Sequence, residues 1–471
     1  MINFILNNDD ISTDQPPGST VLDFVRYHKN LKGTKIGCRE GDCGACTILV
    51  GELVGEVVKY RSMTSCLMPL ANASCKHIVT IEGINPTDRG LTPVQQAMID
   101  ESGTQCGFCT VGFVMSLTGF CIDETAKTRE MAVSAVDGNI CRCTGYKSIE
   151  RAAYRVSEPP AVAGGLRSAI DKQIIPEYFS AISKRLASIQ SGNNDAYNHP
   201  LPPVVPTVAA FVGGGTDVYV QKPDAMAETE ATPLFYDEAL RGIRDTGVYI
   251  EIGASATVTD LLVSPVMQSI FPNLYKHLKL VSSTPIRNMA TLAGNFVNAS
   301  PIGDMTVWFL ALNAQIVLEA GVRTGSGSDR VLPLRNLYLG YKQLAKQPDE
   351  IITTIRFNKP SGDFRFNFEK VSKRTYLDIS TANTAISLHL DENIIRDPHV
   401  SAGGVAPIPL YLKETSAFLR EKEVNAETVA EAIEVMQSEI SPISDVRGTE
   451  QYKRLLLRQL FRAHFVEMFN V

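Results

Sequence analysis

The sequence has no cysteine after Cys143, no long apolar run and no basic leader. Its nearest approach to an apolar run, Val307 to Leu312, is far shorter than the roughly 18 residues that a membrane span requires. The first residues, MINFILNNDD, carry acidic side chains where a signal peptide carries basic ones. The sequence therefore predicts a soluble, cytoplasmic protein with no membrane partner, in which thiols stay reduced and can bind metals.

Several functional motifs are also missing. The net charge is −6 and no long basic block occurs, so nothing indicates a nucleic-acid partner. Neither G-x-G-x-x-G nor G-x-x-x-x-G-K-S/T is present, which argues against a Rossmann dinucleotide fold and a P-loop. The seven histidines form no spaced pair such as H-E-x-x-H. No catalytic acid or base can therefore be assigned, and the catalytic residues stay unknown.

All ten cysteines lie between Cys38 and Cys143, and four of them follow a ferredoxin-like spacing. A C-x4-C-x2-C run in GCREGDCGACTIL is followed, after a gap of nineteen residues, by a fourth thiol. The four are Cys38, Cys43, Cys46 and Cys66. This is the plant-type 2Fe-2S spacing, and Gly37, Gly41 and Gly44 permit the positive φ and close backbone approach that a cluster loop needs. A zinc site or a set of buried free cysteines is the alternative.

A second group combines C-x2-C in TQCGFC with C-x-C in NICRC, separated by 31 residues. Its members are Cys106, Cys109, Cys141 and Cys143. Apolar residues between the two motifs recur at helical intervals, which predicts two helices that bring the motifs together. The spacing alone also suits zinc, but the ferredoxin-like segment before it favours a second 2Fe-2S cluster. Cys75 and Cys121 lie outside both groups and are predicted to be packing residues.

Local patterns predict a multidomain α+β chain of roughly three or four domains. In the first 85 residues, strand-like stretches at 3–6, 47–50, 57–60 and 77–81 surround a helical Val21 to His28, as in a β-grasp ferredoxin fold. Proline, glycine and asparagine accumulate at 158–206, which is typical of a linker, with one amphipathic stretch at 174–189 between them. The last part predicts strands at 366–370, 384–390 and 399–404, then helices. The predicted boundaries are 1–85, 86–157 (helical), 158–206 (linker), 207–362 (α+β) and 363–471 (C-terminal α+β).

Two segments of the cysteine-free region carry a ligand signal. FVGGGTDV at 211–218 places three glycines after a strand-like 208–212, and such a loop can present backbone N–H groups to a phosphate. A plain turn is the alternative reading of this loop. PIRNMATLAGNFVNASPIGD at 285–304 is rich in small and amide side chains, which would suit close packing against a planar ligand.

Taken together, these motifs resemble the molybdenum hydroxylases of the xanthine dehydrogenase/aldehyde oxidase family. GCREGDCGACTIL, TQCGFC, CRCTGY, the glycine-triplet loop, AGNFVNASPIGD and FEKVSKRTYLDIS occur in this order in the small subunits of xanthine dehydrogenase-like members. The resemblance covers nearly the whole chain. It implies two 2Fe-2S domains, an FAD-binding domain of the PCMH/vanillyl-alcohol-oxidase type at 207–362, and a C-terminal α+β domain of the flavoprotein unit.

The resemblance also implies which residues hold the cofactors. Gln105 would reach the molybdenum cofactor of a partner subunit, so the cluster of the second cysteine group would be the nearer one to molybdenum. The residues implied to bind FAD are Phe211, Val212, Gly213, Gly214, Gly215, Thr216, Asp217, Val218, Thr291, Gly294, Asn295, Asn298, Asp304, Ile352 and Lys370. The sequence departs from relatives at Val111, where proline is common, and at Val281, where some relatives stack an aromatic ring on the flavin.

The implied function is electron transfer out of a molybdenum centre. A large partner subunit with the molybdenum cofactor would oxidise hypoxanthine or xanthine to urate in purine catabolism, and this chain would pass the electrons through two 2Fe-2S clusters and FAD to NAD. Two small and two large subunits would form a heterotetramer. Two alternatives stay open: the same architecture acting on an aldehyde or another N-heterocycle, and a redox module without a substrate of its own.

Overall fold

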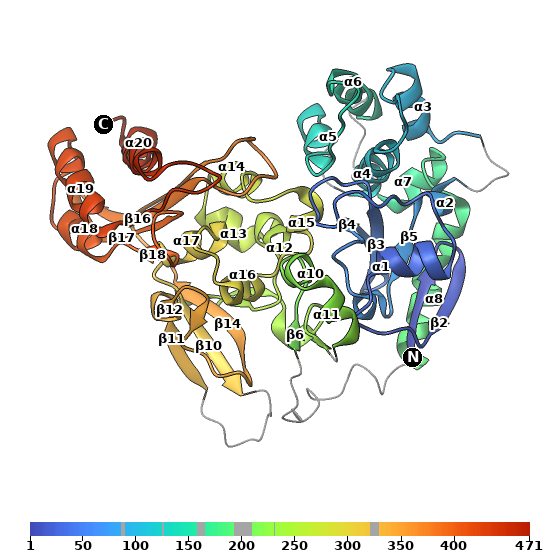
Figure 1. The fold of residues 1–471 in the computed structure, drawn as a ribbon, viewed down its shortest axis with the longest axis horizontal. Helices are drawn as coiled ribbons and strands as arrows, with labels where there is room; N and C mark the ends of the chain where they lie inside the picture. Colours follow the sequence, from blue (N-terminus) through green and yellow to red (C-terminus); the bar gives the residue numbers. More distant parts are fainter. Residues whose placement is uncertain (86–89, 125–126, 158–164, 193–209, 230, 321–328) are drawn as a thin grey trace. The chain divides into compact units, whose positions relative to one another are not determined.

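The computed structural model describes residues 1–85, 90–124, 127–157, 165–192, 210–229, 231–320 and 329–471. The chain forms two compact units. Unit 1 contains Met1–Phe235 and Ser283–Ala290, and unit 2 contains Tyr236–Ser282 and Thr291–Val471. Figure 1 labels their helices and strands. In these ranges no helix is both long enough and apolar enough to cross a membrane.

Unit 1 begins with a five-stranded sheet of the β-grasp type, as predicted. Its strands, in the order β2-β1-β5-β3-β4, are β1 (Ile2–Leu6), β2 (Asp9–Thr13), β3 (Thr47–Val54), β4 (Val57–Thr64) and β5 (His77–Val79). β1 runs parallel to β5, and the other neighbours are antiparallel. The predicted helical segment forms α1 (Val21–Asp23) and the π-helix η1 (Phe24–His28), and the ring of Phe24 packs edge-on against that of Phe4 in the sheet. Only β2 was not expected from the sequence.

The second part of unit 1 is helical, also as predicted. Its helices are α2 (Ile81–Ile84), α3 (Pro93–Asp100), α4 (Thr110–Ile122), α5 (Arg129–Ala135) and α6 (Lys147–Val156). A capping box of Thr92 and Gln95 starts α3. Every residue of α4 from Gly112 onward is buried, because this helix packs against β3 and its neighbouring helices at once. α4 is therefore the central helix of this part.

Part of the stretch predicted as a linker belongs to the core of unit 1. It forms α7 (Leu166–Asp171), the 3₁₀ helix η3 (Glu177–Ala181) and α8 (Ile182–Gly192). The ring of Phe179 lies 5.5 Å from that of Tyr60 and 5.2 Å from that of His77, both in the ferredoxin sheet. The apolar periodicity in this stretch is that of a packed helix, whereas linker composition is confined to the residues around it. Residues 158–164 and 193–206 of the predicted linker lie outside the described residues.

The remaining elements of unit 1 come from three places in the sequence. They are η2 (Leu70–Ala73), the parallel pair β6 (Ala210–Val212) and β7 (Ala231–Pro233), the short helices α10 (Val218–Gln221) and α11 (Pro223–Glu228), and α15 (Thr284–Arg287). Residues 208 and 209 of the strand predicted at 208–212 lie outside the described part. The predicted domain 207–362 is thus divided between the two units in the structure.

Unit 2 opens with an antiparallel sheet and a group of helices. The strands, in the order β11-β10-β14-β9-β8, are β8 (Ile243–Asp245), β9 (Tyr249–Gly253), β10 (Gln315–Ala320), β11 (Arg330–Pro333) and β14 (Glu350–Asn358). Short elements η4 (Glu238–Leu240), η5 (Leu334–Asn336) and the hairpin β12 (Tyr338–Gly340)–β13 (Gln343–Leu344) accompany it. The helices are α12 (Val258–Val263), α13 (Pro265–Ile270), α14 (Leu274–Lys279), α16 (Leu292–Asn298) and α17 (Asp304–Leu310).

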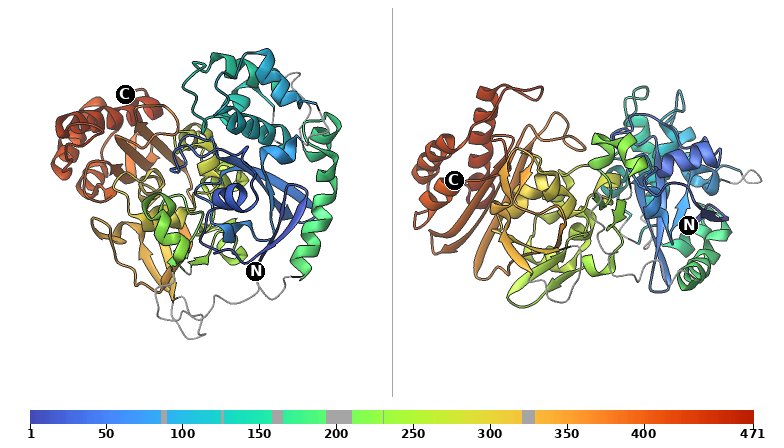
Figure 2. Two further views of the ribbon diagram at one scale, coloured as in Figure 1. Left: turned by 45° about the vertical axis from the view of Figure 1, so that its right-hand side comes forward. Right: turned by 60° about the horizontal axis from the view of Figure 1, so that its bottom comes forward.

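The C-terminal part of unit 2 is a second antiparallel sheet covered by helices, as Figures 1 and 2 show. The strands follow in order as β15 (Asp363–Val371), β16 (Ala382–Asp391), β17 (Ile394–Gly403) and β18 (Leu410–Tyr411). The helices are α18 (Lys413–Leu419), α19 (Ala426–Glu439) and α20 (Glu450–Phe469). Ile386, Leu388 and Val400 of the sheet share one apolar core with Leu457 and Phe461 of α20. The α+β prediction for this part is confirmed.

Candidate functional site

The first cysteine group folds into two adjacent thiol pairs. The Sγ atom of Cys38 accepts hydrogen bonds from the N–H groups of Glu40 at 3.3 Å and Cys43 at 3.4 Å. The Sγ atom of Cys43 in turn accepts the N–H of Cys38 at 3.4 Å. Cys46, at the end of the loop, and Cys66, after β4, form the other pair through a hydrogen bond between their thiols. The loop thus folds back on its own sulfur atoms.

In each pair, hydrogen bonds lower the pKa of one thiol and so favour its thiolate form. The Cys43 thiol and the surrounding backbone N–H groups lower the pKa of Cys38 to about 5, although burial opposes this. The bond to Cys66 lowers the pKa of Cys46, and the same bonds raise the pKa values of Cys43 and Cys66. The thiolate is the form of cysteine that binds iron. The donor set therefore fits a metal-sulfur cluster.

Two glycines shape the loop of the first group by conformation and by space. Gly41 has φ +78° and Gly44 has φ +68°, which residues with a side chain rarely adopt. A Cβ on Gly41 would lie 2.7 Å from side-chain carbons of both Leu67 and Ile286. A Cβ on Gly44 would lie 2.3 Å from the Gly138 carbonyl oxygen. A side chain at Gly44 would therefore meet backbone, and one at Gly41 would displace the ends of Leu67 and Ile286.

The second cysteine group also forms two pairs. The Sγ atoms of Cys106 and Cys143 lie 3.6 Å apart and are exposed, whereas Cys141 is buried and bonded to Cys109. Thr144 donates to the Sγ of Cys141 from its N–H at 3.4 Å and from its hydroxyl at 3.2 Å. Burial alone would raise the pKa of Cys141, but the bonds from Thr144 lower it. Burial and the hydrogen bond to Cys141 raise the pKa of Cys109 to about 12.

Each cysteine group consists of two thiol pairs, which can be compared with the two metal chemistries that the spacing left open. Among the residues that the structure describes, no three His, Cys, Asp or Glu side chains gather closely enough to hold one metal ion. A structural zinc site directs four ligands at one ion, whereas a 2Fe-2S cluster places two thiolates on each of two irons. Two pairs per group fit the cluster better. Cys75 and Cys121, outside both groups, are buried as predicted.

Asn139 links the two cysteine groups, and the sequence motifs did not identify it. Its side-chain Nδ2 donates to the Gly44 carbonyl at 3.1 Å, and its Oδ1 accepts the Ser116 hydroxyl of α4 at 2.8 Å. The N–H of Ile140 donates to the Cys43 carbonyl at 3.0 Å. The only available signal for Asn139 was its position two residues before Cys141. The turn that carries the second group is thereby bonded to the loop of the first.

The predicted phosphate loop lies in unit 1, next to the segment that follows Cys66. A Cβ on Gly215, which has φ +86°, would lie 2.5 Å from the Leu67 carbonyl oxygen, and one on Gly214 only 1.8 Å from the Met289 carbonyl oxygen. Asn72 Nδ2 donates to the Gly213 carbonyl at 3.3 Å. No described residue accepts a hydrogen bond from the N–H groups of Gly213 to Thr216. These donors remain available to an anion, which fits the pyrophosphate of FAD.

In unit 2 the structure brings Asp304 and Lys370 together. The Nζ of Lys370 lies 2.7 Å from Oδ2 of Asp304 and also donates to the Leu280 carbonyl at 2.7 Å. The other carboxylate oxygen of Asp304 accepts the Ser380 hydroxyl at 2.6 Å and Asn383 Nδ2 at 2.5 Å. Sequence reasoning did not identify Ser380 or Asn383. Their signal, the LDISTAN stretch, lies about 80 residues away in the chain from Asp304.

The other residues predicted for the flavin take part in local structure. Thr291 caps α16 by accepting the N–H of Gly294 at 3.2 Å, and Asn295 accepts both the N–H and the hydroxyl of Thr306. Asn298 accepts Lys342 Nζ at 2.8 Å. Ile352, also predicted for the flavin, is buried in β14. Val281, where some relatives have an aromatic residue, is buried too. Gln105, predicted to reach the partner's molybdenum cofactor, is exposed beside Cys106 in unit 1.

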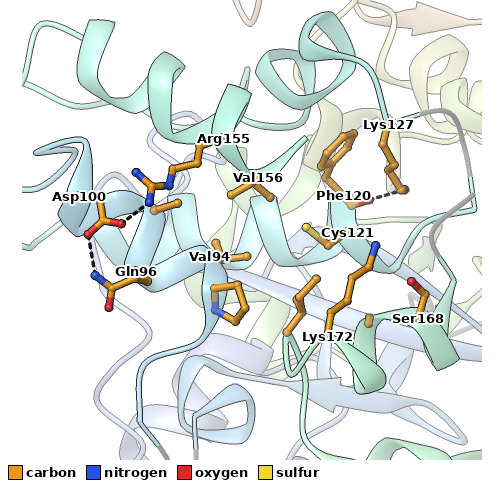
Figure 3. A pocket seen from close by; sticks show the side chains of 14 residues that line it. Val94, Gln96, Asp100, Phe120, Cys121, Lys127, Arg155, Val156, Ser168 and Lys172 are labelled. Carbon is orange, nitrogen blue, oxygen red and sulfur yellow. Dashed lines mark hydrogen bonds and ion pairs between the residues drawn. The ribbon is translucent and has the colours of Figure 1, made fainter. Parts of the chain in front are cut away.

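A cavity of about 410 Å³ in the helical part of unit 1 lies apart from both cysteine groups (Figure 3). Three of its charged side chains, Lys127, Asp100 and Arg155, are bound by the chain itself. Lys127 donates to the carbonyls of Phe120 and Asp123 at the C-terminal end of α4, and Arg155 pairs with Asp100. Lys127 therefore caps α4, where a cation interacts favourably with the helix dipole.

Four family models match parts of the chain. A 2Fe-2S iron-sulfur cluster binding domain matches residues 4–71, and a 2Fe-2S binding domain matches 80–154. The FAD binding domain in molybdopterin dehydrogenase matches 206–360, and the CO dehydrogenase flavoprotein C-terminal domain matches 368–468.

Similar curated proteins are much longer than this chain. Xanthine dehydrogenase of Emericella nidulans is 29% identical over 90% of this chain and 35% of its own length. Xanthine dehydrogenase 1 of Arabidopsis thaliana is 26% identical over 94% of this chain and 38% of its own. Aldehyde oxidase 4 of Mus musculus is 26% identical over 99% of this chain and 39% of its own. The chain thus spans little more than a third of these relatives.

Solved structures match a little over half of the chain. A carbon monoxide dehydrogenase from Hydrogenophaga pseudoflava, described as lacking the Mo-pyranopterin moiety of the molybdenum cofactor, has a TM-score of 0.50 and 26% identity, covering 54% of this chain and 87% of the matched one. Reconstituted CO dehydrogenase from Oligotropha carboxidovorans gives a TM-score of 0.50, 25% identity and the same two coverages.

Proposed function

Because the chain belongs to the xanthine dehydrogenase/aldehyde oxidase family of molybdenum hydroxylases and carries its iron-sulfur and flavin domains, we propose that it is the electron-transferring subunit of a xanthine dehydrogenase-like enzyme. A large partner subunit with the molybdenum cofactor would oxidise hypoxanthine or xanthine to urate. This chain would pass the electrons through two 2Fe-2S clusters and FAD to NAD, in a cytoplasmic heterotetramer of two small and two large subunits. Several relatives named xanthine dehydrogenase support this substrate.

The chain's own residues have separate tasks in this proposal. One cluster would be held by Cys38, Cys43, Cys46 and Cys66, and the other by Cys106, Cys109, Cys141 and Cys143. Backbone N–H groups and the Thr144 hydroxyl stabilise the thiolates, and such bonds tune the potential of a cluster. The N–H groups of Gly213 to Thr216 would bind the FAD pyrophosphate, and Lys370 with Asp304 would contribute to flavin binding.

The observation that carries the proposal is the continuity of these sites within unit 1. The turn before Cys141 is bonded to the loop of Cys43 and Gly44, and the segment after Cys66 packs against Gly215. The first cysteine group therefore contacts the turn of the second group on one side and the glycine loop on the other. This order suits electron transfer from a partner beside the exposed Cys106 toward a flavin.

The test is to purify the chain anaerobically with its proposed large subunit, measure iron, acid-labile sulfide and FAD, and add xanthine or NADH. We expect both to bleach the flavin. In the Cys106→Ala variant, which should lose the second cluster, we expect NADH to bleach the flavin while xanthine no longer does.

Two other outcomes would contradict parts of the proposal. Zinc in place of iron would contradict the cluster assignment. Intact cofactors that neither xanthine nor another substrate reduces would favour a redox module without its own substrate.

An aldehyde is the second candidate substrate. Aldehyde oxidase 4 is 26% identical over 99% of this chain, and xanthine dehydrogenase 1 of Arabidopsis thaliana is also 26% identical. Bleaching by an aldehyde such as benzaldehyde, with no response to xanthine or hypoxanthine, would favour this candidate. Oxygen consumption without NAD reduction would in addition replace NAD as the acceptor.

A further inference from the structure

A segment of eight residues, Ser283–Ala290, leaves the sequence of unit 2 and packs within unit 1. Its first anchor is Asp137, which follows α5. One carboxylate oxygen of Asp137 accepts the Thr284 N–H at 2.7 Å, and the other lies 2.7 Å from an Arg287 guanidinium nitrogen. The Thr284 hydroxyl donates to the Ser134 carbonyl at 3.1 Å.

The Asp137–Arg287 pair is deeply buried, with both side chains 3% exposed. Arg287 also donates to the Thr284 hydroxyl at 2.8 Å, so the charges share a network in which most polar atoms have partners. Buried charges are retained only when they are paired in this way, and removing one partner leaves the other uncompensated. The pair therefore holds the segment in a single position.

That position seats the segment on the loop of the first cysteine group. Ile286 packs on Gly41. A Cβ added to Gly41 would lie only 2.7 Å from the Cδ1 atom of Ile286. Asn288 Nδ2 donates to the Ser62 carbonyl of β4 at 2.8 Å, and the Thr64 hydroxyl lies 3.5 Å from the Met289 sulfur. Ile286 is thus an apolar cover over the turn between Cys38 and Cys43, held from both ends.

Asp137 also connects this anchor to the turn of the second group. Two residues later, Asn139 bonds to the Gly44 carbonyl, and a Cβ on Gly138 would lie 2.7 Å from Pro285. The same short stretch therefore contacts the segment on one side and the first cysteine loop on the other.

We propose that Asp137 and Arg287 are positioning residues that fix Ile286 over Gly41 and so exclude water from the cluster held by Cys38, Cys43, Cys46 and Cys66. This inference rests on the proposed function, because it requires that these thiols bind a 2Fe-2S cluster. Solvent exposure and outer-shell contacts tune both the potential and the affinity of such a cluster. Because Ile286 packs on the loop of the first group, the pair should affect the first cluster more than the second.

The test compares Arg287→Gln with Arg185→Gln in the complete enzyme. Arg185 forms an equally short 2.7 Å ion pair in unit 1, with Asp10, at a more exposed place. For Arg287→Gln we expect roughly ten-fold faster iron release from the first cluster to a chelator and an altered electron paramagnetic resonance signal of that cluster. The signals are assigned with Cys106→Ala, which should keep only the first cluster. Arg185→Gln should match the wild type.

Other outcomes separate this inference from the proposed function. Unchanged release rates and signals in Arg287→Gln would overturn the inference and leave the function standing, whereas a wild-type chain without iron would overturn the function. If Arg287→Gln does not fold, Arg287→Lys decides, because it keeps the charge but not the paired geometry. Faster release from the first cluster alone supports the inference, and equal effects on both clusters overturn it.

Discussion

The ammonium group of Lys370 and the carboxylate of Asp304 form a direct ion pair, 2.7 Å long, between β15 and the first residue of α17. The Lys370 side chain is only 1% exposed, and Ser380 and Asn383 complete the bonds of the carboxylate. A buried lysine needs such a partner, since an unpaired charge is costly to bury. The pair thus joins the FAD-binding part of unit 2 to its C-terminal sheet.

Asp304→Asn should destabilise unit 2 strongly. The substitution leaves the Lys370 ammonium buried beside an uncharged amide, which we expect to cost about 3–5 kcal/mol of unfolding free energy. Urea unfolding followed by circular dichroism measures the change. The matched control is Asp363→Asn, which breaks the exposed pair with Arg365 and should cost at most about 1 kcal/mol. Equal effects of the two substitutions would contradict the structural role given to Lys370.

Replacing single cysteines should divide the ten into two classes. Cys46→Ser should remove half of the iron, because one of the two proposed clusters loses a ligand. Cys121→Ala should keep all of it, since this buried thiol has no part in either group. Iron and acid-labile sulfide analysis distinguishes the classes. Loss of iron in Cys121→Ala, or full iron in Cys46→Ser, would refute the assignment of ligands.

Gly214→Ala should lose flavin and keep iron. The added Cβ would lie 1.8 Å from the Met289 carbonyl oxygen, a backbone atom that cannot rotate away, so the glycine loop must move. We expect FAD occupancy to fall by about ten-fold or more, the loss typical when a supporting contact of a cofactor site is broken. Gly90→Ala is the control, because a Cβ there meets open space. Flavin absorbance relative to protein gives the readout, and normal occupancy in Gly214→Ala would argue against the loop as the FAD site.

Acid should destabilise the C-terminal part of unit 2 through His464. Burial lowers the pKa of this fully buried ring to about 3, whereas the unfolded chain titrates near its ordinary value of 6.5. The unfolded state therefore binds the extra proton as the pH falls below about 6.5, and stability falls by up to about 1.4 kcal/mol per pH unit. His464→Gln should make this slope shallower, and His28→Gln, at an exposed position, should not. Urea unfolding between about pH 7.5 and 5 tests this.

Much of the fold could be predicted from local sequence patterns. The predicted strands and the predicted helix at Val21 to His28 match elements of the β-grasp part, because alternation and helical periodicity are local properties of the sequence. The stretch predicted as a linker contains helices over Leu166–Gly192, and the amphipathic pattern at 174–189 indicated part of them. What covers their apolar face could not be predicted, because Tyr60 and His77 lie about 100 residues earlier in the chain.

The sequence by itself determined which thiols and glycines are available and in what spacing, since a loop such as Cys38–Cys46 is built from neighbours in the chain. Only the tertiary structure decided that Asn139 bonds to Gly44, that Ser380 and Asn383 complete Asp304, and that Ser283–Ala290 packs beside Gly41. These contacts join residues 76 to 245 positions apart. Their partners are selected by packing and by the need to satisfy buried polar groups, which no local pattern encodes.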